Sequence, residues 1–307
     1  MNKTLTKQDF ERVEKDLEQS QAIVRPRLTY WQDAWRRLKK NKLAVVSLGI
    51  LIIIIFMCIF GPYMVSYEYY EQDYTKTNLS PGEEGHIFGT DSLGRDLFSR
   101  VWYGGRVSIF IGVVVAIIAL VIGVTYGGIA GYIGGRVDNI MMRIVDVIMT
   151  IPGTLLNILL LIVMEPGVKT LIIAFGITSW LSMARLVRGQ VLQLKQQEFV
   201  LAARALGADK KRIIFKHLIP NILGPIIVEM TLTIPSAIFS EAFLSYLGLG
   251  IRPPKASWGV LADEGTKVLR FYPHELILPG IFISLTIFAF NLFGDGLRDA
   301  LDPKLRD

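Results

Sequence analysis

Long uncharged apolar runs alternate with short charged segments along most of this 307-residue chain. Residues 43–66 and 107–135 each exceed the roughly 18 apolar residues that indicate a membrane-spanning helix. Such runs favour helices over a barrel, because a helix satisfies its backbone hydrogen bonds within one segment. The pattern therefore predicts an all-α polytopic membrane protein with about six transmembrane helices. The predicted spans are residues 43–66, 107–135, 144–164, 170–184, 218–250 and 276–294.

Two of these spans are irregular in length. Residues 218–250 are too many for one straight crossing, and Pro225 and Pro235 predict kinks or a break there. Residues 170–184 are few, which indicates a tilted or re-entrant segment. A hydrophobic content of 51% and a mean hydropathy of +0.43 agree with a membrane protein.

The distribution of basic residues orients the predicted spans. If the N-terminus is cytoplasmic, 24 of the 33 lysines and arginines fall in inner segments and nine in outer segments. This asymmetry follows the positive-inside rule and predicts that both termini are cytoplasmic. We divide the chain into a cytoplasmic tail (1–42), a membrane domain (43–294) and a cytoplasmic tail (295–307). The predicted location is a bacterial plasma membrane, crossed several times.

The N-terminal tail ends in an amphipathic pattern. Leu28, Trp31, Trp35 and Leu38 share one helical face beside four basic residues, which predicts a short helix in the inner membrane interface. The same charges also act as a stop on translocation of the first span, and both interpretations can hold. The first 42 residues lack the apolar stretch and cleavage site of a signal peptide. The only cysteine, Cys58, excludes a disulfide framework.

Motifs of the common enzyme classes are absent from the sequence. There is no G-x-x-x-x-G-K-[ST] phosphate loop, no H-E-x-x-H zinc helix and no G-x-S-x-G nucleophile elbow. The three histidines are scattered, so we expect no metal site. An "LFGDG" stretch resembles an intramembrane aspartyl protease only superficially, because Leu292 replaces a required glycine. We expect a non-enzymatic chain without a bound cofactor.

The most basic predicted inner loop carries a helix–corner–helix pattern in residues 198–220. Its first part has an apolar stripe at helical spacing, and Gly207 follows where a left-handed cap would end that helix. Asp209 is then a suitable N-cap for a second short helix, which is strongly basic. The stripe is Phe199, Ala202, Ala203 and Leu206; the basic residues are Lys210, Lys211 and Arg212; Glu198 precedes the stripe and Pro220 begins the next span.

A basic loop is usually explained by membrane orientation alone. Membrane orientation does not require a glycine corner between two amphipathic turns. This corner indicates a rigid element that docks on a soluble partner. The stretch resembles the cytoplasmic EAA loop of ATP-binding-cassette importer permeases, in which Glu-Ala-Ala, Gly and Leu-Pro recur at fixed spacing. Ala202, Ala203, Gly207 and Pro220 match, while Leu201 replaces the glutamate, with Glu198 one turn earlier. His217 replaces the isoleucine and Ile219 the leucine.

Three further stretches extend this resemblance over almost the whole chain. Residues 88–108, 240–259 and 291–306 resemble the C-type permease subunit of oligopeptide, dipeptide and nickel importers. The resemblance implies a type I importer transmembrane domain and a heterodimer with a second permease. It also implies two ATPase subunits that hold ATP and Mg²⁺, an extracytoplasmic binding protein, and alternating access. Oligopeptides are the preferred substrate; dipeptides or nickel chelates are the alternative.

Three ionisable residues, Asp146, Glu229 and Glu241, lie within predicted spans and should face protein or water. The two glutamates are about 18 Å apart along an ideal helix and point in different directions, so they do not form one acid pair. Each glutamate either lines the pathway or hydrogen-bonds a neighbouring helix. For Asp146 we favour the interhelical bond.

Charged residues also gather among glycines in the predicted outer loop. Local ion pairs are the favoured explanation, and contact with the binding protein or substrate is the alternative. Trp258, in the stretch "RPPKASWG", suits an outer-interface anchor. The charged residues are Asp91, Arg95, Asp96, Arg100 and Arg106.

Other classes of membrane protein remain as rivals. A stand-alone channel, a secondary carrier or a scaffold is compatible with six spans, but none explains the EAA-like loop. An intramembrane enzyme lacks its signature residues here.

Overall fold

The computed structural model describes residues 29–302 as a mostly helical protein, with a long irregular loop between α3 and α4 and, among these residues, one isolated β-bridge between Thr90 and Asp96. Five helices are long and apolar enough to cross a membrane, and a bent helix pair supplies a sixth candidate. The main helices are α2 (Tyr30–Lys40), α3 (Lys42–Phe60), α4 (Leu97–Ile133), α5 (Gly135–Thr150), α6 (Gly153–Val163), α7 (Val168–Leu194), α8 (Glu198–Ala205), α9 (Lys210–Arg212), α10 (Ile219–Asn221), α11 (Leu223–Tyr246), α12 (Trp258–Val268) and α13 (His274–Leu301).

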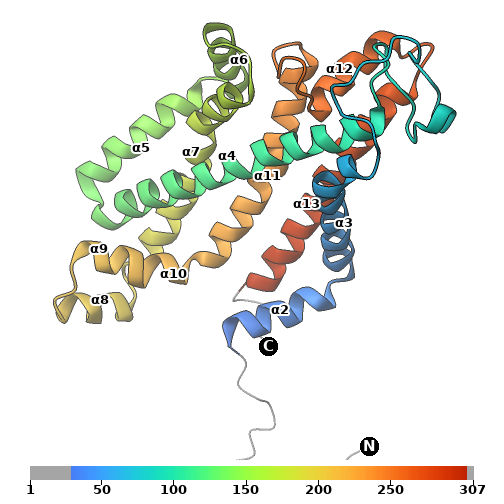
Figure 1. Ribbon diagram of the computed structural model, residues 1–307. Coiled ribbons are helices and arrows are strands. Elements are labelled where there is room, and N and C mark those ends of the chain that lie inside the picture. Colours follow the sequence, from blue (N-terminus) through green and yellow to red (C-terminus); the bar gives the residue numbers. More distant parts are fainter. Residues whose placement is uncertain (1–28, 303–307) are drawn as a thin grey trace, which may run out of the picture.

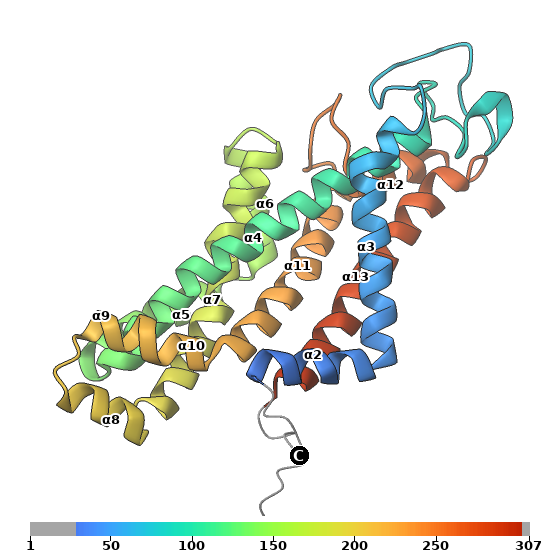
Figure 2. The same cartoon turned by 60° about the horizontal axis from the view of Figure 1, so that its bottom comes forward.

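The helices form two groups joined by α4 and α11. Helices α5, α6 and α7 lie on one side, and α3, α12 and α13 lie on the other (Figures 1 and 2). Helix α4 packs most extensively on α7, whereas α11 packs on both α4 and α13. The short helices α8 and α9 lie at the same end of the molecule as α2, and the loop before α4 lies at the opposite end.

Small residues on α4 allow its close approach to α7. Gly123, Gly127 and Gly131 recur every four residues and so share one face of the helix. A Cβ atom at Gly123 would lie 2.6 Å from the Met183 Cβ atom and 2.8 Å from the Trp180 carbonyl oxygen. This small-residue spacing is a common means of bringing membrane helices together, because backbone packing replaces hydrophobic driving force there.

The third predicted span is not one straight helix. Helices α5 and α6 are bent by 78° at Ile151 and Pro152. Pro152 lacks a backbone N–H and restricts the residue before it to extended conformations, so the helix must stop there. Ile151 has φ −83° and ψ 124°, as this restriction requires.

The prediction of a short or re-entrant fourth span is wrong. Helix α7 has 27 residues and continues through Arg185 and Arg188, whose side chains pair with acidic groups on α5. These arginines ended the uncharged run in the sequence without ending the helix. Helix α13 likewise continues beyond Gly294 to Leu301.

The fifth predicted span contains three prolines and breaks between the first two, Pro220 and Pro225. The chain leaves α-helical geometry at Ile222 (φ −114°, ψ 15°), three residues before Pro225. Pro235 instead lies inside the continuous helix α11. A π-helical segment, Ile213–Leu218, joins α9 to α10 before this break.

The predicted apolar face of α2 is partly buried in the bundle and partly exposed. Leu38 and Ala34 are buried against α13 and α11, whereas Trp31 and Trp35 are half exposed. A single membrane-facing stripe is therefore wrong for Leu38, because that side chain packs inside the bundle. Leu28, the other member of the stripe, lies outside the described residues.

Candidate functional site

The loop between α7 and α11 has the predicted helix–corner–helix form. Gly207 has φ +81°, and the N–H groups of Gly207 and Ala208 donate to the carbonyls of Arg204 and Ala203. This pair of bonds defines a glycine-terminated helix end. Asp209 then caps α9, because its Oδ1 accepts from the Arg212 N–H at 3.1 Å. The left-handed corner and the cap predicted from the sequence are both confirmed.

Buried side chains hold this loop on the membrane domain. Val200 and Ile213 are fully buried and belong to one apolar cluster with Val187 and Val191 of α7. Phe199 and Leu206 of the predicted stripe are exposed, with Leu206 at 88%. The stripe is wrong for Ala203, which faces the bundle at 9% exposure. The loop therefore has a fixed base and a free apolar surface.

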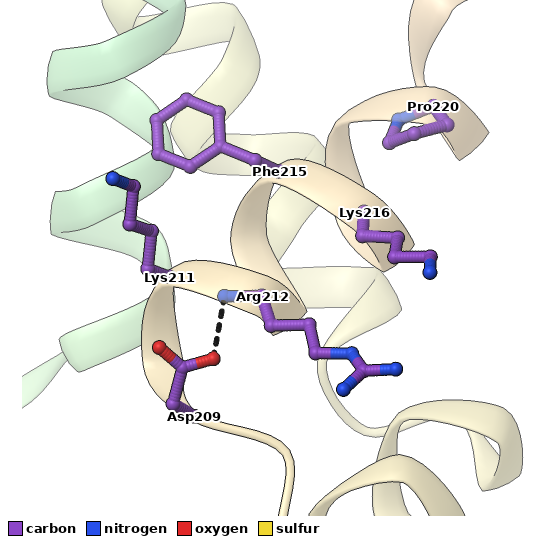
Figure 3. A pocket seen from close by; sticks show the side chains of 6 residues that line it. All are labelled: Asp209, Lys211, Arg212, Phe215, Lys216 and Pro220. Carbon is purple, nitrogen blue, oxygen red and sulfur yellow. Dashed lines mark hydrogen bonds between the residues drawn. The ribbon is translucent and has the colours of Figure 1, made fainter.

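A basic cavity of about 480 Å³ opens beside α9. Phe215 and the cationic side chains of this segment surround it, and Asp209 faces its cap partner Arg212 (Figure 3). Lys210 is also exposed and lines the neighbouring cavity with Leu201 and Arg204. Both cavities are thus lined by cationic side chains together with apolar ones such as Phe215 and Leu201. The first cavity is lined by Asp209, Lys211, Arg212, Phe215, Lys216 and Pro220.

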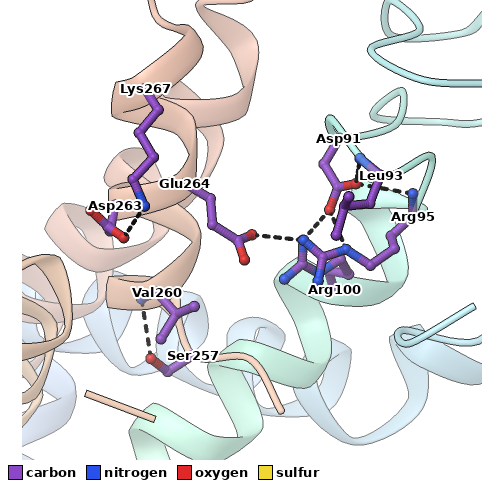
Figure 4. A network of polar contacts seen from close by, with 9 residues as sticks. All are labelled: Asp91, Leu93, Arg95, Arg100, Ser257, Val260, Asp263, Glu264 and Lys267. Carbon is purple, nitrogen blue, oxygen red and sulfur yellow. Dashed lines mark hydrogen bonds and ion pairs between the residues drawn. The ribbon is translucent and has the colours of Figure 1, made fainter. Parts of the chain in front are cut away.

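At the opposite end of the molecule, a largely buried ion-pair network orders the loop before α4 (Figure 4). Asp91 accepts from the side chains of Arg95 and Arg100, and both arginines also contact Glu264 of α12. The Arg95–Asp91 contact is 2.7 Å and the Arg100–Glu264 contact 2.8 Å. The predicted local ion pairs are therefore confirmed. Glu264 was missed, because it lies far from the arginines in sequence.

The remaining charged residues of that stretch have separate partners. Asp96 caps α4 by accepting from the Ser99 N–H at 2.7 Å, and its other oxygen lies 2.8 Å from the His86 Nδ1. Arg106 donates to the backbone carbonyls of Cys58 and Ile59 at the end of α3. These contacts join the loop before α4 to α3 and α4.

The prediction of Trp258 as an outer-interface anchor is wrong. Its side chain is fully buried, and its indole Nε1 donates to the Val101 carbonyl at 2.9 Å. Glycines on α4 leave room for this ring, because a Cβ at Gly105 would lie 2.5 Å from it. Trp258 thus fixes the start of α12 against α4.

The three ionisable residues in the spans occupy different surroundings. Glu241 is fully buried and accepts hydrogen bonds from Ser108 of α4 and Ser245, each at 2.7 Å. Glu241 therefore hydrogen-bonds a neighbouring helix, which was one of its two predicted roles; the other was to line the transport pathway. Asp146 forms the interhelical pair that we favoured, with Arg185 at 2.7 Å. Glu229 lies in a separate polar cavity between α4, α6, α7 and α11.

This arrangement of membrane helices with a helical corner at one end is a fold found in a solved ATP-binding-cassette transporter. The solved structure of the MetNI methionine transporter in an inward-facing conformation has the same fold. It matches at a TM-score of 0.51 and 18% identity, covering 63% of this chain and 94% of that one.

The sequence comparisons then identify the family. Residues 123–307 match the binding-protein-dependent transport system inner membrane component, and residues 29–81 match the N-terminal transmembrane domain of oligopeptide transport permease C. The chain belongs to this family of importer permeases, as a C-type subunit.

Curated relatives match over nearly their full length. The dipeptide transport system permease protein of Bacillus subtilis is 54% identical over 94% of this chain and 90% of its own. The oligopeptide transport system permease protein of Bacillus subtilis is 52% identical over 98% and 99%. Its counterpart in Escherichia coli is 46% identical over 90% and 92%. The chain is thus a multi-pass membrane subunit of a peptide-family transporter.

Proposed function

We propose that this chain forms half of the translocation pathway of an ATP-driven peptide importer in a bacterial plasma membrane. A second, homologous permease supplies the other half. Two ATPase subunits, which hold ATP and Mg²⁺, drive the transport cycle. An extracytoplasmic binding protein delivers the substrate.

The single observation that supports this proposal most is the geometry of the 198–220 loop. Its base is packed into the core, and it presents Leu206, Phe199 and a cationic edge away from the bundle. A side-chain surface of this kind, held by a capped glycine corner, suits seating in an ATPase groove with acidic borders. Closure of the ATPases would then move the loop and, through α7 and α11, the membrane helices.

Oligopeptides are the substrate that we propose first, and dipeptides or nickel chelates are the alternative. The relatives named for oligopeptide and for dipeptide transport have nearly equal identity to this chain, at 52% and 54%. Affinity purification of the tagged chain from its native membrane tests the assembly. Recovery of a second permease with ATPase subunits supports the proposal, and recovery of this chain alone refutes it.

The proposed orientation places both termini and the 198–220 loop in the cytoplasm. Single cysteines at Leu206 and Tyr74, in a Cys58→Ser background, test it because both side chains are well exposed, at 88% and 70%. In vesicles that hold the permease pair without ATPase subunits, which would cover Leu206, an impermeant maleimide should label Leu206→Cys only in inside-out vesicles and Tyr74→Cys only in right-side-out vesicles. The opposite labelling would reverse the orientation.

A further inference from the structure

A cavity lined by several polar side chains lies beside Glu229 within the membrane domain. It has a volume of about 280 Å³, close to the lower limit of small-molecule sites. Glu229 is its only carboxylate, and the described residues that line it include no lysine, arginine or histidine. A lone carboxylate within a membrane domain is costly unless it meets water, a donor or a cation.

Four of the hydroxyl groups that line this cavity donate their hydrogen to backbone carbonyls and so leave only acceptors free. Thr233 donates to the Glu229 backbone carbonyl at 2.8 Å, and Ser240 donates to the Ser236 carbonyl at 2.8 Å. Ser236 and Thr178 bond carbonyls of their own helices in the same way. A hydroxyl has one hydrogen and two lone pairs, so each of these groups keeps its acceptor capacity.

Two further oxygens at the cavity have no partner within the described part of the chain. Asn157 is only 7% exposed, yet its Oδ1 accepts no hydrogen bond. The Ser179 hydroxyl is likewise buried and unpaired. Buried polar atoms are nearly always paired, so such atoms indicate that a ligand or water completes them. The cavity therefore combines one negative charge with a set of unused acceptors.

We infer that this cavity holds the free α-amino group of a peptide during its passage, with Glu229 as the counter-ion. An ammonium group has three N–H donors and no acceptor, which matches the lining. The α-amino group of a peptide has an ordinary pKa of about 7.7–8.0, so it is mostly cationic at neutral pH. This inference rests on the proposed peptide import and adds a specificity residue to it.

The first test measures ATP-driven uptake of a labelled peptide by the complete complex in proteoliposomes. We expect Glu229→Gln to lower uptake at least fivefold, while ATP hydrolysis stimulated by the loaded binding protein changes less than twofold. Glu229→Asp should retain at least half of the uptake. Glu165→Gln is the matched control, because Glu165 is exposed in the connection between α6 and α7 and does not line the cavity. Unchanged uptake by Glu229→Gln would overturn the inference.

The second test detects the amino terminus directly. Ser182 is exposed and lines the same cavity, so Ser182→Cys in a Cys58→Ser background can trap a passing thiol. With an added thiol oxidant, which takes up the two electrons and two protons released when the two thiols join, a peptide with an amino-terminal cysteine should form several-fold more disulfide than its isomer with a carboxyl-terminal cysteine. Adding Glu229→Gln should remove that preference. If the preference persists, the carboxylate serves another partner, such as the second permease, and the inference fails.

The two tests separate this inference from the proposed function. If the unmodified complex shows no ATP-dependent peptide uptake, the proposed function itself fails. If that uptake is present but Glu229 is irrelevant to uptake and trapping, only the assignment of the cavity fails.

Discussion

Gly207 gives a sharp test of loop docking, because the chain contains a second glycine in the same local geometry. Gly207 and Gly248 have φ values of +81° and +78°, and each follows the last turn of a helix with the same pair of backbone hydrogen bonds. A Cβ atom at either position would meet nothing within 4 Å. Gly207→Asp and Gly248→Asp therefore impose the same strain at opposite ends of the protein.

The strain itself is modest. A non-glycine residue in the left-handed region costs about 1–2 kcal/mol, and aspartate is among the better tolerated residues there. Both variants should lower thermal stability by similar amounts. Any further defect of Gly207→Asp, in ATPase binding or coupling, must come from contact with another subunit. There the new carboxylate would enter a closely packed interface.

The assay is retention of the ATPase subunits by the purified permease pair, followed by ATP hydrolysis stimulated by the binding protein. We expect Gly207→Asp to weaken ATPase retention more than tenfold, which corresponds to about 1.4 kcal/mol. Gly248→Asp should retain the ATPases as the unmodified chain does. Equal retention and equal ATPase coupling in the two variants would refute the docking of this loop.

Three further predictions concern stability and access. Gly123→Ala should destabilise the α4–α7 contact by about 1–3 kcal/mol through overpacking, whereas Gly189→Ala, which meets no atom within 4 Å, should be nearly neutral in thermal unfolding. Arg100→Leu should cost about 3 kcal/mol, because it leaves Asp91 and Glu264 with Arg95 as their one shared cationic partner in this largely buried network, whereas Lys267→Ala breaks an exposed pair and should cost less than about 1 kcal/mol in the same assay. Cys58, at 2% exposure, should resist maleimide labelling until the protein is denatured.

Features that depend on neighbouring residues were predictable from the sequence. The glycine corner at Gly207 and the cap at Asp209 each need only a few residues in order, and both formed as expected. The pairing of Asp91 with nearby arginines belongs to the same kind, since its partners are four and nine residues away. Apolar run length likewise located most of the membrane helices.

Features that depend on distant packing were not predictable in this way. Glu264 joins the outer network from α12, and no local pattern connects it to Arg100. Trp258 has an amphipathic ring that suits an interface, and only the room left by α4 glycines places it inside. Charged residues on α7 made the predicted span too short, because the hydropathy of one segment does not show that these residues pair with acidic residues on α5.

The contact between α2 and α13 has a consequence for biosynthesis. The Tyr30 hydroxyl donates to the Leu301 carbonyl at 3.0 Å, so the first and last described helices close the bundle on each other. Ala34 and Leu38 are buried against residues near the end of the chain. A chain emerging from the ribosome makes these residues early but completes their surroundings last. In the nascent protein, α2 must therefore remain unburied until α13 has been inserted.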